Sequence, residues 1–383
     1  MHDDRITRQQ MLPQMRSCVG MVRVRRDFWA DAVGTNRACV LTQRYSVGVY
    51  DLPAFYVQQQ APDLPHCYGR TRCADHCDEN DRFQSIHRCN IMRRVRRERQ
   101  RGVTLLQDGV KSRFVQVGPI RAHYLEAGEG EPVVLMHSAE FGGRALFSWR
   151  YTLGPLAEHF HVYAPDMVGF GLTDKVYDFA DPSGFRVRFI QDWMDALRLD
   201  AAHFVGNSFG GSLILAVAAS ASPAWNVRSI VTSSGGGHAP INNARQILNE
   251  YDGSRDWMRR ILQVLFWDER WWNESTVEER WLASREPGAW ESIAAARFRT
   301  PGAERPRAPE RPDYSLITVP TLITGGAQDL LREPGAWQLL HEQIPGSELK
   351  IFSPARHCPH IEFAEEFNQL VADFIARHPI ARH

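Results

Sequence analysis

The sequence predicts an α/β protein built on a mostly parallel, doubly wound sheet, and three observations favour this class. From residue 113 onwards, short apolar runs alternate with helical stretches, which is the pattern of a parallel sheet covered by helices. A Gly-x-Ser-x-Gly motif at residues 206–210 stands between one such run and an Ala-rich helical stretch. The groups that could carry chemistry follow the apolar runs, at the edge where such sheets bind ligands.

The predicted elements follow one another in a regular order. Two segments flanking Gly118-Pro119 form an N-terminal hairpin, because Gly and Pro mark the turn between them. The later strands are short apolar runs of the kind that a parallel sheet buries, and helices separate them. The hairpin strands are predicted at 113–117 and 120–126, the later strands at 132–136, 161–165, 202–205, 227–233, 320–324 and 348–352, and helices near 148–159, 185–198 and from 209.

Composition and charge exclude several classes of function. The chain has 383 residues, 43% of them hydrophobic, with 45 basic and 45 acidic side chains and a formal net charge of zero. A balanced charge gives no overall field that would attract nucleic acid or an anionic membrane. No apolar run approaches the roughly 18 residues of a membrane span. Together with an N-terminus that lacks the apolar core of a signal peptide, this predicts a cytoplasmic protein without nucleic-acid or membrane partners.

The composition changes near residue 102. Residues 1–102 are rich in arginine and lack lysine, with six arginines in 93–101, and we interpret them as a disordered extension. Two alternatives remain open: the arginine run binds nucleic acid or phospholipid, or Met92 is the true start of an over-extended reading frame. The remainder is predicted to divide into a first core part at 103–237, a Trp-rich helical lid at 238–314 and a second core part at 315–383.

The cysteines indicate neither a disulfide framework nor a clear metal site. Six of the seven lie before residue 90, and Cys358 stands alone near the C-terminus. Three cysteines between residues 67 and 77 raise the alternative of zinc, but only Cys73 and Cys77 have a Cys-x2-4-Cys spacing, and tetrahedral sites are recognised by two such pairs. We therefore expect inert thiols, no metal and no cofactor.

Ser208 is the predicted nucleophile. It is the centre of Gly206-Asn207-Ser208-Phe209-Gly210, between a strand and a helix, which is the context that a nucleophile elbow requires. The turn lifts the serine hydroxyl above the sheet and directs the N–H of Phe209 towards a developing oxyanion. The alternative is an ordinary glycine-rich turn.

A serine hydroxyl needs a base, and the chain order of this fold is serine, acid, histidine. Asp329 follows the apolar run at 320–324, where its carboxylate can reach an imidazole; otherwise it caps the next helix. His357 lies between the last strand and the last helix and is the predicted base. His360 is the rival base three residues later.

The second oxyanion donor is expected in the loop after residues 132–136. The backbone N–H of Ala139, with Ser138 as the alternative, is the predicted donor. His137 is expected to brace this loop.

From about residue 113 to 378 the chain resembles the α/β-hydrolase superfamily, and within it the meta-cleavage-product hydrolases, which break a carbon–carbon bond in ring-opened aromatics. The residues that carry the resemblance are those of the elbow, the lid segment 265–281 and the segment after His357. The resemblance implies that Arg280, followed by Trp281, binds the substrate carboxylate with help from Asn207. It also implies a homodimer. The sequence departs from the pattern where Ser138, Ala139 and Glu140 replace glycines, and where Cys358 replaces an aromatic residue in the pocket wall.

The lid itself favours an apolar or aromatic carboxylic acid as substrate. Its many tryptophans predict an aromatic-binding pocket, unless they only pack the lid on the sheet. Arginine suits a carboxylate because of its bidentate geometry, although Arg280 could instead pair Glu278 or Glu286.

The predicted reaction is hydrolysis of a 2-hydroxy-6-oxo-dienoate. Three other functions stay open. These are a carboxylesterase or thioesterase with the same triad, a slow-turnover ligand receptor on the same scaffold, and nucleic-acid binding through the arginine run.

Overall fold

The computed structural model describes residues 109–298 and 312–380, together with the backbone of two short strands. These strands, β1 (Met21–Val24) and β2 (Val47–Tyr50), pair antiparallel in a sheet of their own. The sequence analysis did not predict them, because four residues are too few for a strand period to stand out. The predictions about the arginine run at 93–101 and about the first six cysteines fall outside the described residues.

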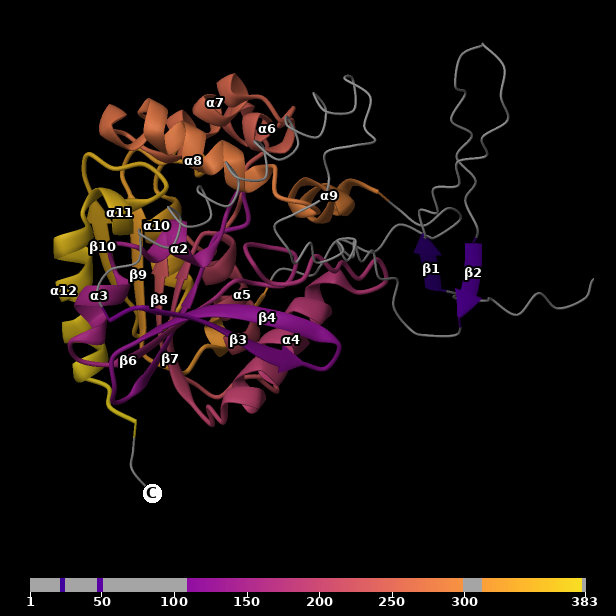
Figure 1. Cartoon of the computed structure of the whole chain (residues 1–383). Helices are drawn as coiled ribbons and strands as arrows, with labels where there is room; N and C mark the ends of the chain where they lie inside the picture. Colours follow the sequence, from indigo (N-terminus) through magenta and orange to yellow (C-terminus); the bar gives the residue numbers. More distant parts are fainter. Residues whose placement is uncertain (1–20, 25–46, 51–108, 299–311, 381–383) are drawn as a thin grey trace, which may run out of the picture.

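An eight-stranded sheet forms the centre of the protein, in the order β10-β9-β8-β7-β5-β6-β4-β3 (Figure 1). Only β4 runs antiparallel to its neighbours, β3 and β6, and every other pair in this sheet is parallel. This confirms the predicted fold class, including the hairpin of β3 and β4. The strands are β3 (Lys111–Val117), β4 (Ile120–Ala127), β5 (Pro132–Met136), β6 (His161–Pro165), β7 (Ala202–Asn207), β8 (Val227–Ser233), β9 (Thr321–Gly326) and β10 (Glu348–Phe352).

Helices cover both faces of the sheet and bury it in two apolar clusters. On one face, Trp193 of α4, Ile214 of α5 and Leu340 of α10 are buried against the strands. On the other face, Trp149 of α2 and Phe367 of α12 fill the second cluster. The helices concerned are α2 (Ala145–Trp149), α3 (Leu153–Ala157), α4 (Pro182–Leu197), α5 (Phe209–Ala218), α10 (Ala336–Gln343), α11 (Pro359–Glu362) and α12 (Ala364–Ala376).

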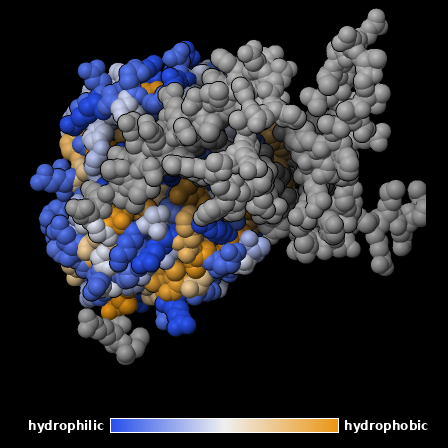
Figure 2. Space-filling view, viewed as in Figure 1, coloured by the Kyte–Doolittle hydropathy of each residue, from blue (hydrophilic) through white to orange (hydrophobic). Residues whose placement is uncertain are grey.

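A helical lid is inserted between β8 and β9. Helices α6, α7 and α8 gather at one end of the sheet, at the top of Figure 1. The outside of this end is mainly hydrophilic (Figure 2), and exposed ion pairs such as Arg255 with Glu278 lie there. The lid elements are α6 (Asn243–Asn249), α7 (Arg255–Leu265), η1 (Glu269–Trp271), α8 (Glu274–Ser284), α9 (Ala289–Ala294) and η2 (Ala295–Arg297), and η3 (Tyr314–Leu316) precedes β9.

Most of the lid tryptophans have structural contacts. Trp257, Trp271 and Trp281 pack around the third apolar cluster, which is formed by α7, α8 and the loop after β5. Trp257 donates its indole N–H to the Ile247 carbonyl at 2.8 Å. Among the described residues, none of the helices combines the length and apolar character needed to cross a membrane.

Candidate active site

The nucleophile elbow lies where β7 ends and α5 begins. Ser208 has φ 51° and ψ −111°, a strained conformation for a residue with a side chain. The turn is possible because its flanks are glycines. A Cβ on Gly206 would lie 2.5 Å from the N atom of Gly211, and one on Gly210 would lie 2.3 Å from the carbonyl oxygen of Met136. The two glycines therefore make the sharp turn possible, because a larger residue at either position would clash with the backbone.

His357 connects Ser208 to Asp329. Its Nε2 lies 2.7 Å from Oγ of Ser208, and its Nδ1 lies 2.8 Å from Oδ2 of Asp329. A carboxylate can only accept, so Nδ1 carries the proton and Nε2 is left to accept the hydroxyl proton. The structure therefore brings together the three side chains that the sequence analysis selected, although 149 residues separate Ser208 from His357.

The surroundings of Asp329 keep it ionised. Burial by itself raises the pKa of this carboxyl, but the charge and hydrogen bond of His357 outweigh burial, so the pKa lies below its usual value. Oδ1 accepts the N–H of Leu331 at 2.9 Å. Asp329 can thus hold the imidazole in one tautomer and one orientation, which is what the acid of such a triad must do.

His360 is placed away from the nucleophile. Its Nδ1 lies 2.9 Å from Oγ of Ser233, and its ring packs against Trp149. Burial lowers its pKa to about 3, so it is neutral near pH 7. The sequence offered two candidate bases, His357 and His360. Within the described residues, only His357 contacts Ser208.

The loop after β5 is held by His137. The Met167 N–H donates to Nε2 of this histidine at 2.9 Å, and Nδ1 lies 2.6 Å from the Ser138 carbonyl oxygen. Ala139 and Phe209 both pack against the same apolar cluster. Within the part of the chain that the structure describes, neither N–H forms a hydrogen bond, so both donors are available to an oxyanion.

Three other residues that were predicted to contact the substrate have structural contacts within the protein. Asn207 is 1% exposed and donates from Nδ2 to the Ser233 carbonyl at 2.9 Å, so its amide braces the elbow. Trp281 donates its indole N–H to the Gly253 carbonyl at 2.9 Å and packs within the lid. Cys358 is buried in the same apolar cluster, and burial raises the pKa of its thiol. The family resemblance gave their sequence positions but not the directions of their side chains.

Arg280 already has an anionic partner, and it is none of those considered from the sequence. Nη2 of Arg280 contacts Oε1 of Glu140 in a buried ion pair. Glu278 pairs with Arg255 and Glu286 with Arg144, so both predicted alternatives were wrong. Sequence reasoning missed Glu140 as the partner of Arg280. The only available signal was a carboxylate at a position where the resembling family has glycine, since a carboxylate that becomes buried must find a cation.

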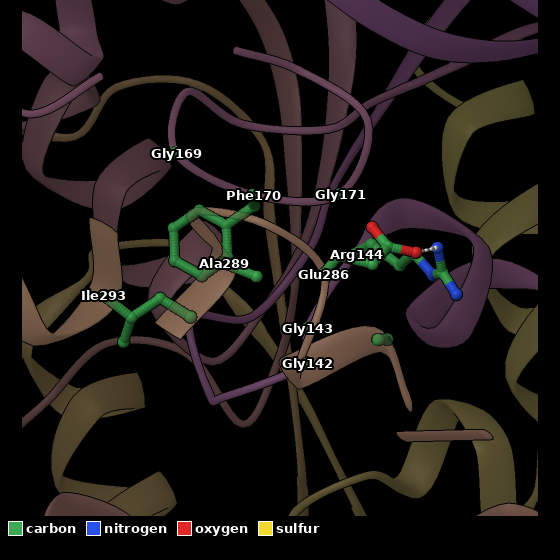
Figure 3. Close-up of a pocket in the computed structure, with 10 residues that line it drawn as sticks. Gly142, Gly143, Arg144, Gly169, Phe170, Gly171, Glu286, Ala289 and Ile293 are labelled. Atoms are coloured by element: carbon green, nitrogen blue, oxygen red, sulfur yellow. Dashed lines mark hydrogen bonds and ion pairs between the residues drawn. The ribbon is translucent and has the colours of Figure 1, made fainter. Parts of the chain in front are cut away.

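A small pocket lies beside this loop, at its junction with the lid (Figure 3). Arg144 and Glu286 pair at one side of it, with 3.3 Å between Nη1 and Oε1. Ser208, Asp329 and His357 are not among the residues that line this pocket. Its lining residues are Gly142, Gly143, Arg144, Gly169, Phe170, Gly171, Ala283, Glu286, Ala289 and Ile293.

The lid is also fastened to the loop that carries His357. The His357 N–H donates to the Leu265 carbonyl at 3.0 Å, and Oε1 of Glu362 accepts the Trp267 N–H at 2.7 Å. Oε2 of Glu362 accepts the Arg356 N–H at 2.9 Å. The position of His357 therefore depends on contacts with the end of α7.

Comparison with known proteins places this geometry in a family. The sequence pattern described as alpha/beta hydrolase fold matches residues 132–364, which is more than half of the chain. The chain belongs to the α/β-hydrolase fold family. This α/β-hydrolase is 31% identical to a 2-hydroxymuconate semialdehyde hydrolase of Pseudomonas sp. strain CF600, over 67% of the chain and 91% of the relative. It is 32% identical to a 2-hydroxy-6-oxo-2,4-heptadienoate hydrolase of Pseudomonas putida, over 69% and 96%.

Solved structures agree with these sequence matches. A meta-cleavage product hydrolase from Pseudomonas fluorescens IP01 superposes on this α/β-hydrolase with a TM-score of 0.63 at 29% identity, covering 70% of our chain and 98% of the other. A serine hydrolase involved in carbazole degradation gives 0.58 at 27% identity, covering 70% and 99%. The predicted resemblance to the meta-cleavage-product hydrolases is confirmed.

Proposed function

We propose that this α/β-hydrolase cleaves the carbon–carbon bond of a 2-hydroxy-6-oxo-dienoate, with Ser208 as nucleophile, His357 as base and Asp329 as its orienting acid. The observation that carries the proposal is the pair of contacts of His357, 2.7 Å to Ser208 and 2.8 Å to Asp329. Relatives named for hydrolysis of such dienoates support the substrate class.

The first half of the reaction forms an acyl-enzyme. The dienol ketonises, so that the proton of the 2-hydroxyl is lost and C5 gains one. His357 then takes the proton of the Ser208 hydroxyl as Oγ attacks the C6 carbonyl. The N–H groups of Phe209 and Ala139 hold the resulting oxyanion, and loss of one such donor costs about 2.7–4 kcal/mol.

The second half releases both products. When the oxyanion collapses, the C5–C6 bond breaks and its electron pair enters a dienolate conjugated with the C2 carbonyl. The imidazolium of His357 supplies the proton that gives 2-hydroxypenta-2,4-dienoate. His357 then deprotonates a water molecule, which attacks the acyl group on Ser208 and releases a carboxylic acid.

A carboxylesterase or thioesterase using the same triad is the second candidate. It is favoured by the Glu140–Arg280 pair, because a guanidinium that already holds a carboxylate is less available to an acidic substrate. The chemistry at Ser208 would be identical, with an alcohol or thiol leaving in place of the dienolate.

Product analysis separates the two candidates. The purified enzyme is mixed with 2-hydroxy-6-oxo-6-phenylhexa-2,4-dienoate, and separately with a p-nitrophenyl ester. The proposal expects equimolar benzoate and 2-hydroxypenta-2,4-dienoate, absent with Ser208→Ala. Ester hydrolysis without any benzoate from the dienoate would move the assignment to an esterase.

A further inference from the structure

The Glu140–Arg280 pair is sealed from solvent. Each side chain is only 8% exposed, and Oε1 of Glu140 contacts Nη2 of Arg280. The backbones of the loop after β5 and of helix α8 also approach each other closely, because a Cβ on Gly142 would lie 2.5 Å from the Arg280 carbonyl oxygen. The loop after β5 and helix α8 are therefore joined by a buried charge pair that water does not screen.

Glu140 carries its charge at neutral pH. Burial acts to raise the pKa of this carboxyl, but the charge of Arg280 and the hydrogen bonds from Ser138 and Arg280 lower its pKa to about 2. The positive charge of the Arg280 guanidinium and the negative charge of the Glu140 carboxylate therefore largely cancel each other.

The pair lies beside the reacting groups. Glu140 directly follows Ala139, whose N–H is an oxyanion donor in the proposed reaction. On the other side, the charges of Glu140 and Arg280 both act on the thiol of Cys358, the residue after His357. Nε of Arg280 is buried and forms no hydrogen bond with any described residue. The guanidinium thus has a donor that lacks a partner among these residues.

We propose that Glu140 is a specificity-determining residue that competes with the substrate for Arg280. The inference rests on the proposed function and deepens it, because it concerns the charge at the end of the substrate far from the scissile bond. A substrate carboxylate that binds Arg280 becomes the second negative charge around a single, largely buried cation. A neutral group at the same place, such as an amide, meets no such repulsion. The enzyme consequently accepts neutral analogues better than a site with an unpaired arginine would.

The test compares acidic and neutral forms of the same substrate. One pair is 2-hydroxy-6-oxo-6-phenylhexa-2,4-dienoate and its primary amide, and the other is p-nitrophenyl hydrogen adipate and its terminal amide. The measured quantity is the ratio of kcat/KM for the acid to kcat/KM for the amide. It is determined for wild type and for Glu140→Gln, which retains the hydrogen-bond acceptor but removes the charge.

Two further variants make the comparison decisive. Glu279→Gln is the matched control, because Glu279 is the neighbour of Arg280 on α8 and pairs with Arg150 at 2.7 Å in another contact between lid and core. The double variant Glu140→Gln with Arg280→Gln removes both buried charges together. Because it leaves no unpaired buried cation, it can be measured even if Glu140→Gln does not fold.

The proposal expects Glu140→Gln to raise the acid-to-amide ratio about 10- to 100-fold, mainly through KM for the acid. The ratio stays within about threefold of wild type in Glu279→Gln and in the double variant, because the double variant loses a cation that was already neutralised. An unchanged ratio in Glu140→Gln would overturn the proposal. So would a fall of about tenfold or more in the double variant, since Arg280 would then hold the acid despite Glu140.

A failure of the proposed function would give a different experimental result from a failure of the proposal about Glu140. If no variant cleaves the dienoate or its amide, carbon–carbon hydrolysis is refuted, and the adipate pair still reports whether Glu140 controls the charge of the substrate.

Discussion

His357 lies 2.7 Å from Ser208 through Nε2, while His360, only three residues later, is turned towards Ser233. The two histidines share one short segment and both are buried, yet only one can act on the nucleophile. What separates them is the start of α11 at Pro359, which turns His360 back into the sheet. The contact with Ser208 supports the proposal that His357 is the base, and mutation of the two histidines tests it.

Substitution of each histidine in turn should have contrasting effects on kcat. We expect His357→Gln to lower kcat by about 10⁴-fold or more, because the hydroxyl of Ser208 loses its base. His360→Gln is expected to leave kcat within about threefold, since this side chain does not contact Ser208. Steady-state kinetics on the phenyl dienoate or on a p-nitrophenyl ester measures both. A larger loss from His360→Gln than from His357→Gln would reverse the assignment.

Asp329→Asn should retain the fold and lose activity. The amide can still fill the space of the carboxylate, but it no longer favours the tautomer in which Nε2 of His357 accepts a proton. A decrease in kcat of about 10⁴-fold is expected. Circular dichroism checks the fold, and an activity within tenfold of wild type would show that Asp329 is only a structural residue.

Because His360 is buried in its neutral form, we expect the protein to lose stability in mild acid. Its pKa in the folded state is about 3, below the ordinary value near 6.5, so the unfolded chain binds a proton that the folded chain does not. This contribution to stability is complete above pH 6.5 and is lost as the pH falls towards 3. From pH 6.5 to 5 the loss is about 2 kcal/mol in the free energy of unfolding.

Urea titrations at the two pH values measure this change. His360→Gln should show a smaller loss than wild type, although not none, because burial also lowers the pKa of His137 and of His203. An identical pH slope in the two proteins would mean that His360 is not held neutral by the fold.

The elbow should tolerate no added methyl group. In Gly210→Ala the new Cβ would meet the Met136 carbonyl oxygen at 2.3 Å, so strand and helix must separate. We expect a loss of about 3 kcal/mol or more, with activity falling as Ser208 moves. Gly346→Ala separates steric clash from backbone strain, because Gly346 has a positive φ of 72° but nothing lies within 4 Å of the new atom. That variant should lose only about 1 kcal/mol. A loss from Gly210→Ala no larger than that from Gly346→Ala would show that the elbow can accommodate the methyl group.

Much of the fold follows from local sequence patterns. The apolar runs at residues 132–136 and 202–205 are short, continuous and followed by helices, so a parallel sheet was predictable. The glycines around Ser208 specify the elbow by steric exclusion, which is a local property of the chain. Chain order then limited the partners of Ser208 to an aspartate and a histidine in later loops.

Side-chain directions in the lid and in the loop after β5 were not predictable in this way. Whether Arg280 faces a substrate or Glu140 depends on how α8 packs on a loop 140 residues earlier, and no local pattern records that contact. The same applies to Trp281, whose indole N–H is directed to Gly253 within the lid. Asn207 was assigned to the substrate by resemblance, whereas its buried amide binds the Ser233 carbonyl.

The central claim is that Ser208 performs carbon–carbon hydrolysis of a dienoate. The most direct test is to mix wild type and Ser208→Ala with 2-hydroxy-6-oxo-6-phenylhexa-2,4-dienoate in a stopped-flow instrument and follow the visible absorbance of the substrate. We predict rapid and complete loss of absorbance with wild type, at rates within the usual range of about 1–1,000 per second, and a loss at least about 10³-fold slower with Ser208→Ala. Equal rates in the two proteins, or no loss with wild type while it still hydrolyses p-nitrophenyl esters, would contradict the account.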